Sequence, residues 1–381
     1  MSQRAQLLAL GLCLALALAL RLHQIGLSPF WMDELATVWF VRLPVAELFG
    51  PVLRMESNPP GYYLLLRGLS PLGGEGGPGP RPRAPTGGGG AVPPPGPYPR
   101  RSFGLVAGLL AAFGIAVAAM HLKVSQEARN YATLYLLCSL ALLLLERALA
   151  AAPGRGRLLA IVLGQGLLGA AMLQLHSTAP FAVAALHVYG LVRIALMQGR
   201  RLGLLLALLG AGALTLALSG WWLAVALEIA RAPVSSIRWI KRPDLSEFAL
   251  TMGAGLIAPF IDWRAYAAAA LLGLLLAMAA LLAWRRRDER AVALVAALVA
   301  GAALFGGVSQ LVPVLLDRTA LVLLVFAMPL FAWVVATWPS RGLGAALGAA
   351  FVVLSGTGIA AHSRPDAVLG RQHTPWRHAV E

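Results

Sequence analysis

Two acidic residues, Asp33 and Glu34, stand side by side directly after an aromatic pair, in the run FWMDE at residues 30–34. Adjacent carboxylates of this kind can act as a general base or as ligands of a metal ion. They can instead cap a short helix that begins after Pro29, because the N-terminal end of a helix favours nearby negative charge. The residues alone leave both interpretations open.

Cations gather in two further polar segments, residues 121–130 (HLKVSQEARN) and 228–263. Lys123 and Arg129 of the first segment can hold a phosphate, since a guanidinium presents a bidentate fork to an anion. The alternative is an ordinary solvated loop bordered by snorkelling cations. The second segment carries Arg231, Arg238, Lys241 and Arg242 in its first half. This positive charge suits an anionic partner, or it has no such meaning, because charge in long loops is poorly governed by the positive-inside rule.

Two other polar residues have simpler expected roles. His176 at the end of an apolar run is expected to be a packed or interfacial histidine. Arg318 follows Asp317 at the start of another run, where we expect an interaction within its own helix or a snorkelling side chain. Trp221 and Trp222 are typical of the aromatic belt at a membrane surface.

Composition identifies the elements that must position these residues. The 381-residue chain is 59% hydrophobic and only 12% charged, with a mean hydropathy of +0.75, whereas soluble domains average about 45–50% apolar and about 25% charged residues. Ten apolar runs approach the roughly 20 residues that cross a bilayer as a helix. They are residues 5–22, 105–119, 131–145, 158–175, 180–197, 202–227, 266–284, 291–311, 320–336 and 343–361.

This pattern predicts an all-α, polytopic transmembrane helical bundle. It excludes a soluble enzyme, a nucleic-acid-binding protein, a secreted disulfide scaffold and a transmembrane β-barrel. The net charge of +15 lies in short loops between apolar runs, so it does not indicate nucleic acid. Cys13 and Cys138 both fall within apolar runs, which indicates neither a disulfide framework nor a thiolate metal site.

Loop charge predicts the orientation. With one further crossing between residues 62 and 101, the bundle has about 11 spans, with a cytoplasmic N-terminus and a non-cytoplasmic C-terminus. The inside segments would then be 1–4, 74–102, 146–157, 193–201, 285–290 and 338–341, which hold 16 of the 31 Lys and Arg residues but only 4 of the 16 acids. Cytoplasmic loops of membrane proteins carry such an excess of Lys and Arg.

The eleventh crossing coincides with an anomalous stretch, residues 73–99, which is dominated by Gly and Pro. Gly and Pro disrupt the backbone hydrogen bonding that lipid demands. Two explanations stay open: a Pro/Gly-rich linker, or a pair of compensating frameshifts that hides a membrane helix in a neighbouring reading frame. Resequencing the DNA of this stretch would exclude the second explanation if it matched the given frame throughout.

Three motifs together carry a resemblance to a known family: FWMDE at 30–34, ESNPPGYYLLL at 56–66 and SQEARNYA at 125–132. In order and spacing they resemble the polytopic GT-C membrane glycosyltransferases. Within these, the chain is most similar to the bacterial dolichyl-phosphate-mannose-protein mannosyltransferase-like family, whose relatives include the lipid A aminoarabinose transferases. The resemblance covers most of the chain. Weaker parts of it are His176, Trp239, the segment 313–318 and the segment 375–377.

The resemblance implies a GT-C-like transmembrane domain over residues 1–361, with catalytic loops 23–60, 121–130 and 228–263 on the non-cytoplasmic face. A short non-cytoplasmic tail, 362–381, would end where family members often continue. In the family, the stretch that corresponds to 73–99 is the second core helix. This chain departs from the family pattern there, because its stretch lacks the character of a membrane helix. The location implied is the cell envelope, at the bacterial inner (plasma) membrane.

The implied activity is transfer of a hexosyl or pentosyl group from a polyprenyl-phosphate carrier to an acceptor, with inversion of configuration. Asp33 would be the general base, and Glu34 would orient it or contact the acceptor. The donor phosphate would bind Lys123, Arg129, Tyr131, Lys241 and Arg242. Glu56 matches a position that some relatives use for a divalent metal, and no other cofactor is implied. The acceptor, whether a protein, a lipid or a glycan, is not predicted.

Two alternatives remain. The chain can be a transporter or flippase for a lipid-linked sugar, in which the same charges line a path. Transporters usually show internal repeats or broken helices at the membrane midplane, and no such symmetry is present in this sequence. The chain can also be a catalytically inactive relative, which the stretch 73–99 favours and the intact Asp33–Glu34 pair opposes.

Overall fold

The computed structural model describes residues 2–23, 31–69, 103–151, 154–199, 201–232, 237, 239–259 and 262–363. All the regular secondary structure in these ranges is helical. Nine of the described helices are long and apolar enough to cross a membrane, and a bent pair of helices gives a tenth candidate. The predicted all-helical, polytopic bundle is confirmed at this level, while the orientation in a membrane stays a prediction.

The candidate spans follow the predicted apolar runs. They are α1 (Gln3–Leu22), α8 (Tyr131–Ala150), α9 (Arg155–Leu173), α10 (Ala179–Leu196), α11 (Leu202–Ser219), α14 (Trp263–Arg286), α15 (Glu289–Leu311), the continuous segment α16–η4–α17 (Asp317–Ala320, Leu321–Leu323 and Leu324–Thr337) and α18 (Arg341–His362), with α6 (Leu105–Val117) and α7 (Ala119–Ser125) as the bent pair. Several begin at a polar cap; Ser2, Asp262, Asp288 and Ser340 each accept a backbone N–H from the first turn that follows. Such caps satisfy donors that a helix cannot pair internally.

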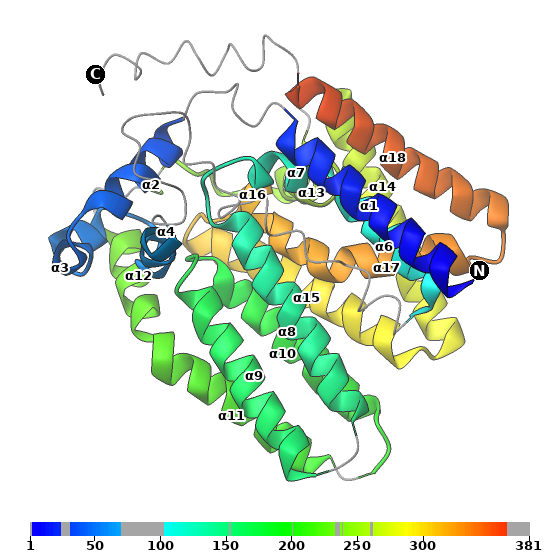
Figure 1. Cartoon of the computed structure of the whole chain (residues 1–381), viewed down its shortest axis with the longest axis horizontal. Helices are drawn as coiled ribbons and strands as arrows, with labels where there is room; N and C mark the ends of the chain where they lie inside the picture. The colour runs from blue at the N-terminus through cyan, green and yellow to red at the C-terminus, as the bar shows by residue number, and fades with distance from the viewer. Residues whose placement is uncertain are drawn as a thin grey trace.

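Polar segments meet at one end of the bundle, which we call the loop end. There Asn130 donates a hydrogen bond to the carbonyl of Leu175, and His362 Nε2 lies 3.1 Å from Gln126 Oε1. Short helices cluster at the same end: α2 (Met32–Arg42), α3 (Val45–Leu48), η1 (Pro51–Arg54), α4 (Gly61–Leu69), α12 (Trp221–Arg231) and α13 (Leu245–Leu256). Figure 1 shows α2, α3, α4 and α12 together at one edge of the molecule.

An ion-pair network centred on the buried pair Glu146–Arg193 holds the opposite end of the bundle. Glu146 of α8 pairs with Arg193 of α10 at 2.9 Å and with Arg290 of α15 at 3.0 Å, and Arg193 also pairs with Glu289 at 2.7 Å. Tyr189 donates a further hydrogen bond to Glu146. The network fixes the relative positions of three spans, because removing one partner would leave an uncompensated buried charge.

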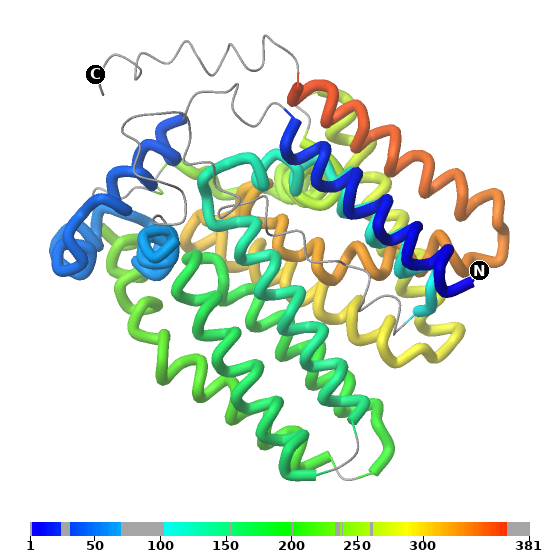
Figure 2. The backbone as a smooth tube through the Cα atoms, in the orientation of Figure 1, coloured from blue at the N-terminus to red at the C-terminus, as the bar shows by residue number. Residues whose placement is uncertain are grey.

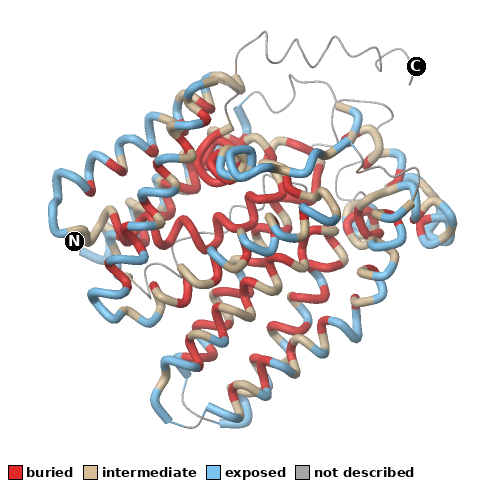
Figure 3. Tube along the Cα trace, turned by 180° about the vertical axis from the view of Figure 1, so that it is seen from behind, coloured by how far each residue is buried: buried red, intermediate tan, exposed pale blue. Residues whose placement is uncertain are grey.

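The core centres on α17, which packs against α6, α14, α15 and α18. Every residue of this helix from Leu324 to Val334 is buried, and Figure 3 shows buried residues concentrated through the middle of the molecule. Small residues let the helices approach closely, as membrane bundles require. Gly114 of α6, for example, faces the side chain of Met328. A second close pair is α9 with α11, which run side by side in Figure 2.

A sharp bend separates α6 from α7. The two helices meet at Ala118 with an angle of 56°. The guanidinium of Arg21, fully buried at the end of α1, donates to the carbonyls of Ile115 at 3.0 Å and Ala116 at 3.2 Å, and lies 2.8 Å from His121 Nδ1. A break in a membrane helix leaves carbonyls without partners, and Arg21 supplies those partners from a neighbouring span.

The structure corrects three predicted boundaries. The run 202–227 is divided at Gly220 into α11 and α12, so the predicted loop 228–263 begins inside α12 and contains α13. Beyond this division, α12 buries Trp222 and pairs Glu228 with Arg54 at 3.1 Å. The predicted loop 121–130 is helical as far as Ser125, leaving 126–130 as the loop. The predicted span 105–119 ends at Val117, where the bend begins.

The anomalous stretch 73–99 and the tail 364–381 lie outside the described residues. The described ends that flank the stretch are on opposite sides of the bundle. Gly61 at the start of α4 packs against Gln174 at the loop end, whereas Phe103 packs against Trp333 near the far end of α17.

Candidate functional site

The motifs FWMDE (residues 30–34) and SQEARNYA (residues 125–132) contact each other at the loop end. Helix α2 begins at Met32 with Trp31 as its N-cap residue, and Glu34 Oε2 accepts the Trp31 backbone N–H at 3.3 Å. The other oxygen, Glu34 Oε1, accepts the backbone N–H of Ala128 at 2.8 Å. The capping interpretation is therefore confirmed for Glu34, which is fully buried and also ties the loop 126–130 to α2.

Arg129 makes the second connection between these motifs. Its Nη1 donates to the carbonyl of Asp33 at 3.1 Å and to Thr37 Oγ1 at 3.2 Å. Its Nη2 lies 3.9 Å from the Asp33 carboxylate. Burial opposes the charge of Arg129, but Tyr131 and the nearby carboxylates outweigh it and raise the pKa of the guanidinium above its usual value. The residue is a permanent, buried cation beside Asp33.

A second cation reaches Asp33 from the other end of the chain. Arg318 of α16 places Nη2 3.5 Å from Asp33 Oδ2. Aromatic rings surround its guanidinium carbon, at 4.9 Å from the ring centroid of Trp31, 6.0 Å from that of Tyr131 and 5.9 Å from that of Trp239. Such cation–π contacts orient a guanidinium without neutralising it. The expectation that Arg318 interacts within its own helix or snorkels is therefore wrong. Arg318 belongs to the same site as Asp33.

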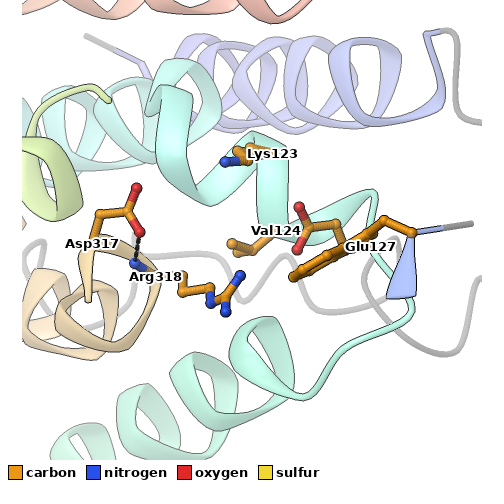
Figure 4. Close-up of a pocket in the computed structure, with 6 residues that line it drawn as sticks. Lys123, Val124, Glu127, Asp317 and Arg318 are labelled. Carbon is orange, nitrogen blue, oxygen red and sulfur yellow. Dashed lines mark hydrogen bonds between the residues drawn. The ribbon is translucent and has the colours of Figure 1, made fainter. Parts of the chain in front are cut away.

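A pocket opens beside this pair of charges. It has a volume of about 180 Å³ and is lined by Trp31, Lys123, Val124, Glu127, Asp317 and Arg318. Figure 4 shows Lys123, Val124 and Glu127 on one side of the space, and Asp317 and Arg318 on the other. The Asp317 carboxylate accepts the backbone N–H of Arg318 at 2.7 Å. Four of the six lining residues carry charge, so the pocket suits a polar group.

The remaining motif, ESNPPGYYLLL (residues 56–66), joins the site through Asn58. Glu56 Oε1 accepts the backbone N–H and the side-chain amide of Asn58, at 3.1 and 2.9 Å. Asn130 then donates to Asn58 Oδ1 at 3.4 Å. No group of three or more His, Cys, Asp or Glu side chains suited to a metal ion occurs within the described residues. The contacts of Glu56 support the loop; its metal role stays a prediction.

His176 lies beneath the two arginines as an uncharged group. Its Nδ1 accepts the backbone N–H of Thr178 at 3.0 Å, which leaves the ring proton on Nε2, and the ring lies 4.9 Å from that of Tyr131. Burial, followed by the charges of Arg129 and Arg318, lowers the pKa of His176 to about 3. The expectation of a packed histidine is confirmed, since only 5% of the residue is exposed.

The structure does not bring all predicted residues together. Lys241 and Arg242 are exposed, and neither lines the pocket or pairs with Asp33. Trp239, two residues earlier, is the described residue of that loop that reaches Arg318. Arg231 is also exposed, and Arg238 lies outside the described residues.

No protein-family model matches the chain, and no curated protein sequence matches it. The fold and site therefore define a class by themselves: an integral, all-helical membrane protein with a partly buried charge cluster and a polar pocket at one end of its bundle. Chemically, a carboxylate between two guanidiniums beside such a pocket can accept a proton while the cations hold an anionic group.

Proposed function

We propose that this protein is a membrane glycosyltransferase that moves a sugar from a polyprenyl-phosphate carrier to an acceptor on the non-cytoplasmic face. The observation that carries the proposal is the position of Asp33, between Arg129 and Arg318 and next to a polar pocket. The GT-C resemblance of the three motifs supports it, because those motifs contact one another at the loop end although they are separated in the chain.

The chemistry follows from the charges. Asp33 accepts the proton of the acceptor hydroxyl, whose oxygen forms a new bond to the anomeric carbon of the sugar. The bond between that carbon and the phosphate oxygen breaks, and the departing polyprenyl phosphate keeps the electron pair. Attack from the face opposite the phosphate inverts the configuration. Lys123 and Arg318, which line the pocket, stabilise the negative charge that develops on the phosphate.

Arg129 and Glu34 have supporting roles in this scheme. Arg129 uses one nitrogen to hold the α2 backbone and directs the other toward the Asp33 carboxylate. Glu34 fixes the loop that carries Arg129. The exposed Lys241 and Arg242 stand apart from the pocket, so in this proposal they attract anionic lipid at long range and do not touch the reacting phosphate.

The test is release of free polyprenyl phosphate from a panel of polyprenyl-phosphate sugars, with purified protein in liposomes and a mixture of peptide, lipid and glycan acceptors. Asp33→Asn is compared with Asp262→Asn, which makes the same chemical change at the exposed cap of α14, where Asn caps a helix equally well. We expect Asp33→Asn to lower the rate by about 10²- to 10⁴-fold, the usual contribution of a general base, and Asp262→Asn to leave it unchanged.

Equal release by wild type and Asp33→Asn would overturn the role of Asp33. The transporter alternative predicts a different result: the labelled lipid-linked sugar would cross the liposome bilayer without any release of polyprenyl phosphate. Thermal unfolding of both variants in detergent shows whether a loss of rate reflects chemistry or folding.

A further inference from the structure

We propose that the pocket between α7 and α16 holds the sugar ring of the donor, and that Glu127 makes the site select against sugars that carry a carboxylate. This inference rests on the proposed function, which it deepens by naming the class of sugar. It concerns the six lining residues of the pocket and the loop 126–130 that presents Glu127.

The size and lining of the pocket fit a single polar ring. The pocket volume of about 180 Å³ is small, and its charged lining would exclude a prenyl chain. Carboxylates accept hydrogen bonds from sugar hydroxyls, and Glu127 and Asp317 supply them from opposite sides of the space (Figure 4).

The pocket also shares a residue with the reacting centre. Arg318 lines the pocket and lies 3.5 Å from the Asp33 carboxylate. A donor whose sugar lies in the pocket therefore has the Arg318 guanidinium within reach of its phosphate, and the same guanidinium contacts Asp33. Lys123 on the other wall offers a second cation to the same phosphate (Figure 4).

Charge decides which sugar the pocket accepts. Lys123 and Arg318 balance Glu127 and Asp317, so the lining is neutral overall, and the phosphodiester of the donor brings one negative charge. A sugar carboxylate would add a second negative charge beside the Glu127 carboxylate, and like charges placed together repel. Neutral and amino sugars avoid that repulsion. The pocket therefore discriminates against uronic acids.

The position of Glu127 is fixed by its burial and by the hydrogen bonds of the neighbouring residues in the loop. Glu127 is 6% exposed. Its two neighbours anchor the loop: Gln126 Nε2 donates to the carbonyls of Arg21 and His23 at 3.2 and 2.8 Å, and Ala128 donates to Glu34. A carboxylate on so fixed a backbone acts as a constant repulsive element, which is how sites commonly reject a close analogue.

The experiment measures binding to the full protein in nanodiscs with three defined lipids: polyprenyl phosphate, polyprenyl-phosphoryl glucose and polyprenyl-phosphoryl glucuronic acid. The wild type is expected to bind the glucose lipid more tightly than the glucuronic acid lipid. In Glu127→Gln the preference is expected to fall by about tenfold or more, because removal of one like charge from a confined site has at least that effect. Binding of polyprenyl phosphate is expected to remain.

Glu47→Gln is the matched control, since Glu47 is exposed on α3 and outside the pocket; its preference should equal that of the wild type. An unchanged preference in Glu127→Gln would overturn the inference, as would an equal loss of binding for all three lipids, which would mean that Glu127 supports the fold. Failure of the wild type to bind any of the lipids would overturn the proposed function as well. Conversely, a shifted lipid preference in Glu127→Gln together with full activity of Asp33→Asn would support the pocket as the sugar site and reject the catalytic role of Asp33.

Discussion

The Asp33 carboxylate and the Arg318 guanidinium lie 3.5 Å apart, although one residue belongs to the first helix after α1 and the other to the start of the central buried helix. The separation from Arg129 is 3.9 Å. Both distances exceed the roughly 2.7–2.9 Å of a charge-assisted hydrogen bond. The three side chains therefore form an open charge cluster, in which the carboxylate can take a proton and the guanidiniums can turn to an incoming anion.

The reaction rate is expected to be sensitive to substitution of Arg318. Arg318→Gln should lower the rate of polyprenyl phosphate release by about 10²- to 10³-fold, the usual effect of removing one donor to a developing charge. Arg318→Lys should fall between this variant and the wild type, because it keeps the charge but loses the planar fork and its contacts with Trp31 and Trp239. Steady-state kinetics check the order. Arg341→Gln, an exposed change in the first turn of α18, is the control; a lysine variant no better than glutamine would contradict the argument.

Gly255 of α13 is expected to control the position of Arg318 indirectly. A Cβ at Gly255 would lie 2.6 Å from the carbonyl oxygen of Asp317 and 3.0 Å from the Cβ of Ala320. Gly255→Ala must therefore displace α16, and we expect both a lower melting temperature and slower turnover. Gly273→Ala in α14 is the matched change, because a Cβ there meets nothing within 4 Å. It should stabilise the protein by about 0.5–1 kcal/mol, the usual gain over a helical glycine. Similar effects of the two substitutions would refute the packing argument.

Arg21→Met is expected to be strongly destabilising. The change would leave the carbonyls of Ile115 and Ala116 and the Nδ1 of His121 without this donor, and each unsatisfied buried group costs about 1–3 kcal/mol. Thermal unfolding in detergent measures the effect. Arg4→Met removes the same side chain from an exposed position on the same helix and should leave the melting temperature unchanged. If both variants melted alike, the bend between α6 and α7 would not depend on Arg21.

The lowered pKa of His176 predicts how the stability of the protein depends on pH. Its folded-state pKa of about 3 lies below the unfolded value of about 6.5, so only the unfolded chain takes up the proton between these values. Its contribution to stability is complete above pH 6.5 and declines as the pH falls toward 3, by at most about 1.4 kcal/mol per pH unit.

His176→Asn tests this, because an Asn side chain can still accept the Thr178 N–H but does not titrate. We expect its melting temperature to fall less steeply than that of the wild type between pH 6.5 and 4. Parallel curves for the two proteins would show that His176 does not contribute to the acid response.

Local pattern was sufficient to predict the spans, because a helix in lipid must be apolar along its whole length. Residues 131–145 and 343–361, for instance, fall within α8 and α18. Boundaries set by neighbours were harder to predict. Gly220 divides an apolar run just before Trp222 and Glu228, whose side chains contact Ser177 and Arg54, and Ala118 marks a bend whose carbonyls are paired by Arg21. None of these partners is visible from the local sequence.

In the site, too, some residues can be predicted from the local sequence and others cannot. Asp33, Glu34 and Arg129 were predicted from two short motifs, and the structure brings them into contact. Arg318 was assigned a local role because its partner is encoded near the other end of the chain. One signal for it was present, in that an Asp-Arg pair directly before a long apolar run is costly in a membrane unless it is used. The exposed Lys241 and Arg242 illustrate the reverse error, because charge content alone does not reveal the direction in which a loop folds.

The buried Arg21 has a consequence for the order in which this protein is made. When α1 leaves the ribosome, the carbonyls of Ile115 and Ala116 have not yet been synthesised, so the guanidinium has none of the distant partners that it has in the folded bundle. A lone arginine deep in hydrocarbon is costly, whereas one near a helix end can extend to the water interface. The contacts between α1 and the bend therefore form only after α6 has been synthesised, and until then the Arg21 guanidinium needs water or another partner.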